Sequence, residues 1–289
     1  MQAPNAPAPL DRIVFRTQSV TIGAFRCPLG HPRFEDSGPI AQHCLVFPRT
    51  AVSIEHEHAP PLIANPNVVT LYNRGQRYLR GAISRDGDRC EWFGLDAQLV
   101  RDVLARFDPS AADRAEELFT RASGSCDAAL YLAQRRVFEL AHSGAPVEPL
   151  ALEECVLGLL ERVCELASEQ VGAALEPARR GASTHELERI LSERWSEPLQ
   201  LSDLAHAVGL SIYHMCRSFR RETGTTLHQY RHQLRLRSSL EPLRESSRPL
   251  VELALQCGFS SHSHYTSAFR REFGTTPSRL RDEHGSEEN

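Results

Sequence analysis

The chain has 289 residues, enough for two domains with cores of their own, and its 41% hydrophobic and 24% charged residues are typical of a globular protein. It has neither a run of eighteen apolar residues nor a secretion signal at its start, so we expect a cytoplasmic protein with no membrane partner. The net charge of −4 is unevenly divided: residues 183–281 carry +4, while residues 1–182 and 282–289 carry −4 each.

The N-terminal third alternates short apolar runs with turn residues. Residues 1–10 are rich in Pro and Ala and are predicted to be a flexible arm. From 11 to 95, strand-like runs are separated by Pro, Gly, Asn and Asp, a spacing typical of a small β-barrel or sandwich. The predicted strands are 20–26, 43–47, 50–55, 67–72, 78–84 and 89–93.

Helical patterns occupy residues 96–174. Helices are predicted over 96–107, 110–122, 125–143 and from 148 or 149 to about 172. In the last of them, apolar residues recur at alternating steps of four and three: Leu152, Val156, Leu159, Val163 and Leu166. Such a seam can pack inside one subunit or between two, and spacing does not separate these alternatives. Residues 175–183, with Pro, Arg and Gly, are predicted to be a linker.

The C-terminal segment, 184–284, contains a sequence repeat, and residues 285–289 form an acidic tail. A helix is predicted over 185–195, and two similar units follow it, 205–231 and 254–281. From their shared phenylalanine onward the units are offset by 50 residues, and both contain Phe-Arg-Arg-Glu, Gly-Thr-Thr and a final Arg. Such a repeat predicts two copies of one supersecondary unit.

Each unit has the pattern of helix, glycine-containing turn and helix. In the first, Gly209 can close a helix at positive φ and Ser211 is the expected N-cap of the next helix. In the second, Gly258 and Ser260 are expected to have these roles, and Pro277 opens a final helix. The stretch between the units is predicted to be one helix of about 20 residues, roughly 30 Å long, close to the 34 Å of one DNA turn.

With these motifs, the segment from Leu199 to Arg281 resembles the DNA-binding domain of the AraC/XylS family of bacterial transcriptional regulators. The resemblance is carried by 209–211 (Gly-Leu-Ser), 258–260 (Gly-Phe-Ser) and 269–278 (Phe-Arg-Arg-Glu-Phe-Gly-Thr-Thr-Pro-Ser), and it covers about a hundred of the 289 residues. Many relatives carry a cupin-like sensor domain, to which 11–95 is loosely similar. The predicted fold is therefore α+β with two domains. A small cupin-like β-barrel or sandwich with trailing helices precedes an all-α domain with two helix-turn-helix units joined by a long helix.

The resemblance places base-contacting residues on the second helix of each unit. The predicted DNA contacts are Tyr213, Cys216, Arg217 and Arg220 in the first unit and His262, Ser263, His264, Ser267 and Arg270 in the second. Arg217 is favoured because Arg pairs bidentately with guanine, whereas Ser267 stands where the family commonly has Arg. We therefore expect the first unit to dominate sequence recognition. The residues expected to contact phosphate or to form structural pairs are Arg220, Arg231, Arg270 and Arg281. The alternative for each predicted base contact is a solvated helix face or a phosphate contact.

Eight cysteines and several histidines raise the question of metal or redox sensing. No two cysteines form a C-x-x-C motif, and small buried side chains are the usual explanation. The metal candidates are His56, His58, Cys27 and Cys90, since sulfur and imidazole suit zinc or copper. His56–His58 resembles the first half of a cupin metal motif, but the second half does not follow at the expected spacing. We expect ordinary histidines and no required cofactor, with a metal- or redox-sensing regulator as the alternative.

The resemblance implies a sequence-specific transcriptional regulator, more often an activator than a repressor. A small molecule or other signal would act through the N-terminal domain, where the effector candidates are Arg49, His56, Tyr72, Arg80 and Trp92. The implied partners are promoter DNA, RNA polymerase and a second copy of the chain. No Gly-x-Ser-x-Gly motif or phosphate loop is present, so a DNA-linked enzyme is the less favoured hypothesis and the chain is predicted not to be an enzyme.

Overall fold

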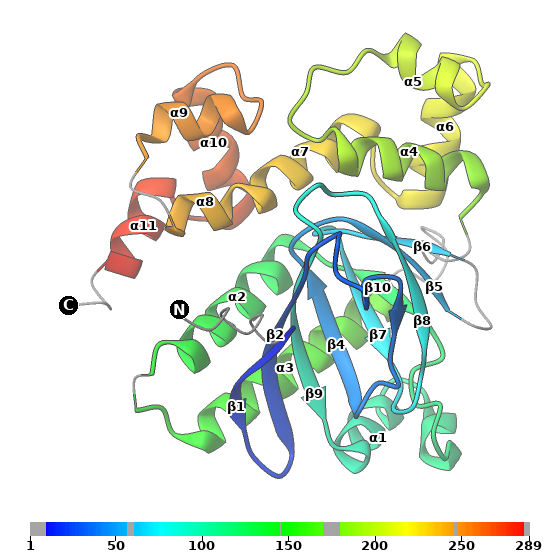
Figure 1. Cartoon of the computed structure of the whole chain (residues 1–289), viewed down its shortest axis with the longest axis vertical. Coiled ribbons are helices and arrows are strands. Elements are labelled where there is room, and N and C mark those ends of the chain that lie inside the picture. Colours follow the sequence, from blue (N-terminus) through cyan, green and yellow to red (C-terminus); the bar gives the residue numbers. More distant parts are fainter. Residues whose placement is uncertain (1–9, 57–60, 145, 170–179, 246–247, 286–289) are drawn as a thin grey trace, which may run out of the picture.

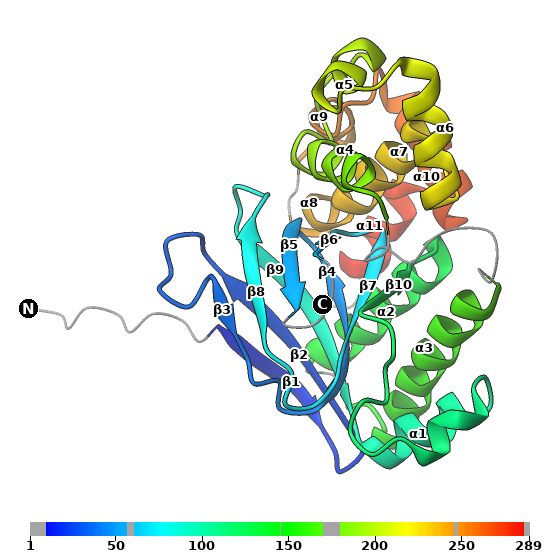
Figure 2. The same cartoon turned by 90° about the vertical axis from the view of Figure 1, so that its right-hand side faces the viewer.

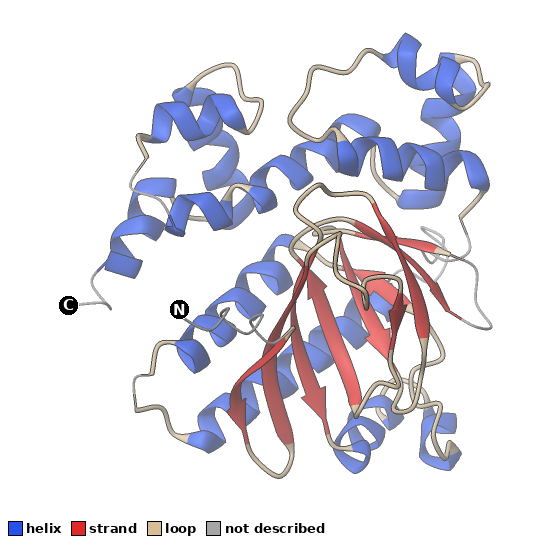
Figure 3. Cartoon of the chain, in the orientation of Figure 1, coloured by secondary structure: helices blue, strands red, loops and turns tan. Residues whose placement is uncertain are grey.

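The computed structural model describes residues 10–56, 61–144, 146–169, 180–245 and 248–285. A β-rich N-terminal region with three helices beside it is followed by a helical C-terminal region that lies across one end of the sheets (Figures 1 and 2). Figure 3 shows the strands together beside the helices, and in the part of the chain that the structure describes the last strand ends at Ser125, as the α+β prediction requires. In the described part of the chain, no helix combines the length and the apolarity needed to span a bilayer.

The β-rich region consists of two antiparallel sheets. One has six strands in the order β1-β2-β9-β4-β7-β10, and the other has four in the order β3-β8-β5-β6. The strands are β1 (Asp11–Arg16), β2 (Val20–Cys27), β3 (Asp36–Ser37), β4 (His43–Pro48), β5 (Val52–His56), β6 (Leu62–Ala64), β7 (Val68–Tyr72), β8 (Tyr78–Ala82), β9 (Asp88–Leu95) and β10 (Ser123–Ser125). Cys27, Phe34, Ile54 and Leu62 form one of the buried clusters of this region.

All six predicted strands are present, as β2, β4, β5, β7, β8 and β9. The sequence missed the edge strand β1, the very short β3 and β6, and β10. The helix predicted over 110–122 is wrong, because a 3-10 helix, Pro109–Asp113, is followed by the chain that leads into β10. Ser123 to Ser125 pair with Val68–Thr70 of β7, and this long-range pairing overrides the local helical pattern.

Two helices, α2 (Ala128–His142) and α3 (Pro149–Glu169), lie along one side of the six-stranded sheet, and α1 (Ala97–Ala105) lies at the end of the sheet beside α3 (Figure 2). Asp96 and Asp127 cap α1 and α2 by accepting hydrogen bonds from backbone amides. The five seam residues of α3 are all buried within the chain, in one apolar cluster with residues of β4, β9 and α2. The seam therefore packs inside the subunit and supplies no surface for a second copy.

The C-terminal region consists of α4 (Ala182–Glu193), α5 (Leu201–Ala207), α6 (Ile212–Thr223), α7 (Leu227–Ser238), α8 (Leu240–Glu245), α9 (Leu250–Gln256), α10 (His262–Phe273) and α11 (Pro277–Gly285). The predicted long helix is thus present as two segments, α7 and α8, with a break at Ser239. Pro242 explains the break, since its nitrogen cannot donate to the carbonyl of Ser238 and its ring crowds that carbonyl. Pro277 begins α11, as predicted.

Buried hydrogen bonds join the two regions. The Asn67 side chain donates to the carbonyl of Tyr230, and Arg237 donates to the carbonyl of Pro66 and to Asn67 Oδ1. Asn65 donates to the hydroxyls of Ser192 and Tyr230. The helical region is thus fixed against the turn between β6 and β7. Most of the predicted linker, 175–179, lies outside the described residues, and the predicted domain boundaries stay predictions.

Candidate nucleic-acid interface

The helix pairs α5–α6 and α9–α10, called the first and second units from here on, have the same turn. Gly209 and Gly258 follow the end of α5 and α9 at φ of 66° and 77°. The amide of Leu210 then donates to the carbonyl of Ala205, and that of Phe259 to the carbonyl of Ala254, at 3.0 Å in both units. This bond satisfies a carbonyl that would otherwise be unpaired at the helix end. Both units therefore consist of a helix, a glycine-containing turn and a second helix.

The cap of α6 is the predicted one, whereas the cap of α10 is not. Ser211 accepts a hydrogen bond from the amide of His214, at 3.3 Å. In the second unit Ser261, rather than the predicted Ser260, accepts the equivalent bond from His264, at 3.1 Å. The one additional residue of the second unit is thus accommodated in its turn. Each cap precedes the buried phenylalanine of its helix by eight residues, so the two second helices match residue for residue.

The outer face of α6 presents the residues predicted to contact bases. Met215 and Phe219 are buried, while Tyr213 is 64% exposed and Arg217 is also exposed. The Arg217 guanidinium donates to the Tyr213 hydroxyl at 3.0 Å, which brings these two predicted contacts together. Cys216 is half-buried beside the core, and Arg220 is exposed one turn further along.

The outer face of α10 has shorter side chains than that of α6, and two of them contact other groups of the protein. Ser263, Ser267 and Arg270 are exposed, and His262 is half-buried, with Nε2 3.4 Å from the Thr266 hydroxyl. His264 is exposed, but its Nδ1 lies 3.2 Å from the Ser260 hydroxyl and its ring contacts Phe259 and His232. These short or engaged side chains offer fewer long donors than α6 does.

Arg231 and Arg281 form hydrogen bonds with backbone carbonyls of the same chain. Arg231 donates to the carbonyl of Glu197, and Arg281 donates to the carbonyls of Leu243 and Arg248, at 3.1 and 2.8 Å. Both arginines therefore satisfy carbonyls of the segments that precede α5 and α9. Arg220 and Arg270 are exposed in the last turns of α6 and α10, where a cation is favoured by the helix dipole.

Arg235 and Gly258 fix the second unit relative to the first, and sequence analysis missed the role of Arg235. Its guanidinium donates to the carbonyls of Trp195 and Glu197, at 2.8 and 3.1 Å. Burial lowers its pKa to about 10. A Cβ on Gly258 would lie 2.3 Å from the Ser196 carbonyl oxygen, so the turn of the second unit packs directly on the chain that follows α4. No local motif marks this contact, since its partners are about 40 and 60 residues apart.

The five effector candidates do not form one site. His56 and Tyr72 have ring centroids 5.3 Å apart, and both rings contact Tyr78, whose hydroxyl accepts a hydrogen bond from Arg80. Arg80 is buried, pairs with Asp88 at 2.7 Å and stacks on Phe25 and Phe34. These side chains occupy the space between the sheets. Trp92 lies on another strand and donates to Asp11, while Arg49 lies at the boundary with the helical region.

Two of the metal candidates, Cys27 and Cys90, have thiols whose surroundings disfavour the thiolate form. Burial raises the pKa of both Cys27 and Cys90, and the thiolate is the form that binds metals. His56 Nδ1 is 2.9 Å from the Gln76 amide nitrogen. In the part of the chain that the structure describes, no group of three His, Cys, Asp or Glu side chains is placed to hold a metal ion. His58 lies outside the described residues.

Comparison with known proteins identifies the class of this domain. Residues 204–283 match the model of a helix-turn-helix domain family. The chain is 35% identical over 127 residues to the HTH-type transcriptional regulator GlxA of Rhizobium meliloti, covering 43% of this chain and 39% of GlxA. It is 36% identical over 85 residues to the right origin-binding protein of Escherichia coli, covering 29% of each chain. The chain thus spans less than half the length of these curated relatives.

A solved structure from Chromobacterium violaceum, described as a transcriptional regulator with an AraC-type DNA-binding domain, is 32% identical. The match covers 35% of the present chain and 91% of the Chromobacterium violaceum chain, with a TM-score of 0.34. The C-terminal domain of the present chain is an AraC-type helix-turn-helix domain, as its motifs predict. The two curated relatives are thus described as a transcriptional regulator and an origin-binding protein.

Proposed function

We propose that the protein is a sequence-specific DNA-binding transcriptional regulator that responds to a small-molecule signal through its N-terminal region. The observation that carries the proposal is the pair of matched helices α6 and α10, which lie at opposite ends of α7 (Figure 1) and toward one side of the helical domain (Figure 2). Their polar faces are exposed while their apolar faces form the cores of the two units. Two such helices could enter successive major-groove segments of promoter DNA.

The two helices would contribute unequally. Arg217, the DNA contact we favour most, has a five-donor guanidinium that can pair with O6 and N7 of guanine, whereas the exposed side chains near the start of α10 are serines and histidines. Arg220 and Arg270 lie where they could reach backbone phosphates. We therefore propose that the first unit specifies sequence and that the second unit mainly positions the protein.

Further features of the proposal rest on analogy with the family. These are an activating role through contact with RNA polymerase, a homodimer, a cupin-like character of the β-rich region and a cytoplasmic location. Because the α3 seam is buried, a dimer would need another surface. Any signal must interact differently with two arrangements of the helix-turn-helix units, since equal affinity for both would shift nothing.

The test is selection of DNA by the full chain from a random duplex library, followed by titration of the selected site over a salt series. We expect an enriched motif and a linear fall of log affinity with log salt, with a slope of about −0.9 per phosphate contacted. Ser263→Ala, a change of one short side chain on α10, should alter the motif less than Arg217→Ala. The absence of both an enriched motif and a salt dependence would contradict the proposed function.

A further inference from the structure

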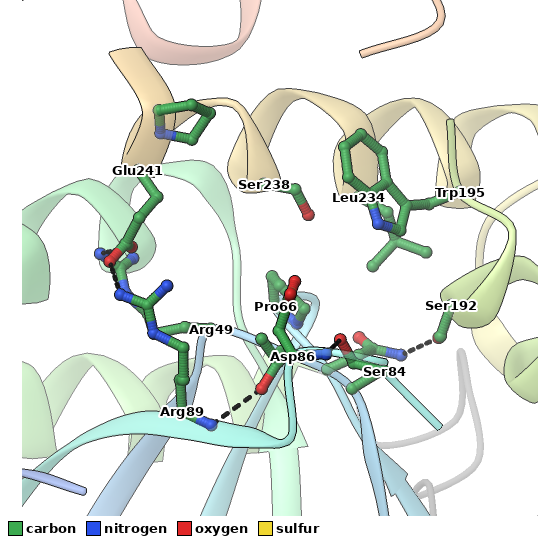
Figure 4. A pocket seen from close by; sticks show the side chains of 14 residues that line it. Arg49, Pro66, Ser84, Asp86, Arg89, Ser192, Trp195, Leu234, Ser238 and Glu241 are labelled. Atoms are coloured by element: carbon green, nitrogen blue, oxygen red, sulfur yellow. Dashed lines mark hydrogen bonds and ion pairs between the residues drawn. The ribbon is translucent and has the colours of Figure 1, made fainter. Parts of the chain in front are cut away.

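A cavity of about 290 Å³ lies where the β-rich region meets the helical region (Figure 4). The helical side contributes Ser192, Trp195, Leu234, Ser238, Glu241 and Pro242, and the β side contributes Arg49, Thr50, Ala51, Asn65, Pro66, Ser84, Asp86 and Arg89. Its volume is at the lower end of the range of small-molecule sites. A ligand in this cavity would touch both regions at once.

The walls combine hydrogen-bonding groups with apolar surface. Hydroxyls of Ser84, Ser192 and Ser238 line the cavity, and Figure 4 shows Ser238 directed from α7 toward its centre. The indole of Trp195 and the side chain of Leu234 form an apolar wall on the same side. A compact molecule with several hydroxyl groups and one carbon face would match these walls.

An arginine pair marks one end of the cavity. Arg49 Nη2 is 2.9 Å from Glu241 Oε2, and Arg89 Nη2 is 2.8 Å from Glu241 Oε1. The Arg49 side chain is 6% exposed, and within the described residues its Nε has no hydrogen-bond acceptor. Both arginines belong to the β-rich region, whereas Glu241, whose carboxylate bridges them, belongs to α8.

Further charged side chains lie behind this pair. Among the described residues, a buried ion-pair network connects the arginines 49, 89, 135 and 244 with the glutamates 91, 139 and 241. Burial raises the pKa of Glu91. Asp86 also lines the cavity, but it is exposed, where water and salt screen its charge. Arg49 and Arg89 already hold one carboxylate at the cavity wall, so a ligand carboxylate in the same position would meet the same donors.

We propose that this cavity binds a small hydroxylated carboxylate, whose carboxylate group replaces that of Glu241 on Arg49 and Arg89. The ligand's hydroxyl groups would bond to the serine hydroxyls, and its carbon face would lie on Trp195. This site differs from the space between the two sheets, which is occupied by His56, Tyr72 and Arg80 with their neighbours.

The proposed exchange gives the ligand a means of control, and this part of the inference rests on the proposed function. Glu241 belongs to α8, directly after the break at Ser239, and α8 leads into the second unit. Loss of its ion pairs with Arg49 and Arg89 would loosen α8 on the β-rich region and leave the pair of Arg244 with Glu139 to hold it, while Asn65 and Asn67 still hold Ser192 and Tyr230. The ligand would thereby change the placement of the second unit relative to the first.

Binding can be measured without DNA, because the chain has two tryptophans, Trp92 and Trp195. In the full-length Trp92→Phe variant, the fluorescence of Trp195 is titrated with glycerate, tartrate and gluconate, and with the neutral polyols glycerol, threitol and glucitol. We expect a saturable change with at least one acid and none with its polyol. Thermal shifts of the wild-type chain provide a second readout, since a ligand that binds the native state stabilises it.

Matched variants test the arginine pair. Arg89→Gln should weaken binding of the acid about tenfold or more, because a charge-assisted contact is lost. Arg85→Gln, which changes an exposed arginine in the turn before β9, should leave binding unchanged. The site is contradicted if no acid gives a saturable response in either readout, or if Arg89→Gln binds as tightly as Arg85→Gln.

The control mechanism is tested on the DNA site selected by the wild-type chain. Glu241→Gln without ligand should have the DNA affinity of the wild-type chain saturated with acid, and adding acid to this variant should change that affinity less than twofold. A full response to acid in Glu241→Gln would contradict the exchange. A chain that binds acid but selects no DNA site would instead contradict the proposed function and leave the binding site supported.

Discussion

The guanidinium of Arg217 donates a hydrogen bond to the hydroxyl of Tyr213, 3.0 Å away, across one turn of α6. Both side chains are exposed, so no core packing holds the arginine in place. In the proposed complex with DNA, the tyrosine would restrict the orientations of the guanidinium before the DNA binds. Such restriction lowers the entropy that a flexible arginine would lose when it forms a bidentate contact with a base.

Replacement of Arg217 by Ala should remove discrimination at a single base pair, at a cost of about 1–3 kcal/mol. Tyr213→Phe keeps the ring but removes the hydroxyl, and we expect it to lose part of the same discrimination at the same position. Competition titrations with single-base variants of the selected site measure both effects. If Arg217→Ala weakens binding equally for all sequences, the residue contacts phosphate instead.

The two turn glycines provide a matched pair for stability. Gly209 and Gly258 both have positive φ, but a Cβ on Gly209 would have no neighbour within 4 Å, whereas one on Gly258 would lie 2.3 Å from the Ser196 oxygen. Gly209→Ala should cost roughly 1–2 kcal/mol of unfolding free energy from the backbone alone. Gly258→Ala should cost about 1–3 kcal/mol more from overpacking. Urea unfolding checks the difference, and equal costs would show that the turn of the second unit does not press on this segment.

Ser260 and Ser261 are adjacent, but only Ser261 caps α10, so their replacement should have different effects on stability. Ser211→Ala and Ser261→Ala should each cost about 1 kcal/mol, because each removes the acceptor for a backbone amide at a helix start. Ser260→Ala should cost a few tenths of a kcal/mol, since the contact of its hydroxyl is with an exposed histidine ring. The same urea measurements rank the three variants. A larger loss in Ser260→Ala than in Ser261→Ala would restore the cap that the sequence predicted.

These serines show which features could be predicted from a few consecutive residues. The glycine turns, the cap of α6 and Pro277 at the start of α11 follow from the preferences of a few consecutive residues, and they were predicted. The cap of α10 was misplaced by one residue, because an additional residue in a turn can be accommodated before or after the cap. The site residues of α6 and α10 were placed by the family resemblance; Cys216 and His262 are half-buried, and the others are exposed.

Contacts between distant residues could not be predicted in this way. Arg237 and Asn67 are 170 residues apart, and the ion pair of Arg49 with Glu241 joins a strand end to a helix that begins after a break. Neither pair has a local pattern, since their proximity depends on how the helical region lies on the sheets. The buried α3 seam illustrates the same limit. Its spacing was compatible with packing inside one subunit or between two, and the structure packs it against the six-stranded sheet and α2 of the same chain.

His232 gives the chain a specific sensitivity to acid. Its ring lies between those of His228 and His264 and against Phe259, and burial, followed by the nearby cations His228 and Arg271, lowers its pKa from 6.5 to about 4. Between these pH values the unfolded chain binds the proton and the folded chain does not. The free energy of unfolding from this residue therefore falls as the pH drops from 6.5 toward 4.

Replacement of His232 by Phe should remove this contribution while keeping a flat ring against Phe259. We expect the stability of the variant to fall less than that of the wild-type chain when the pH is lowered from 6.5 to 4.5. Urea unfolding at both pH values, with the two proteins compared at each, isolates the histidine from the carboxylates that both proteins share. Parallel losses in the two proteins would mean that His232 takes up its proton without opposing the fold.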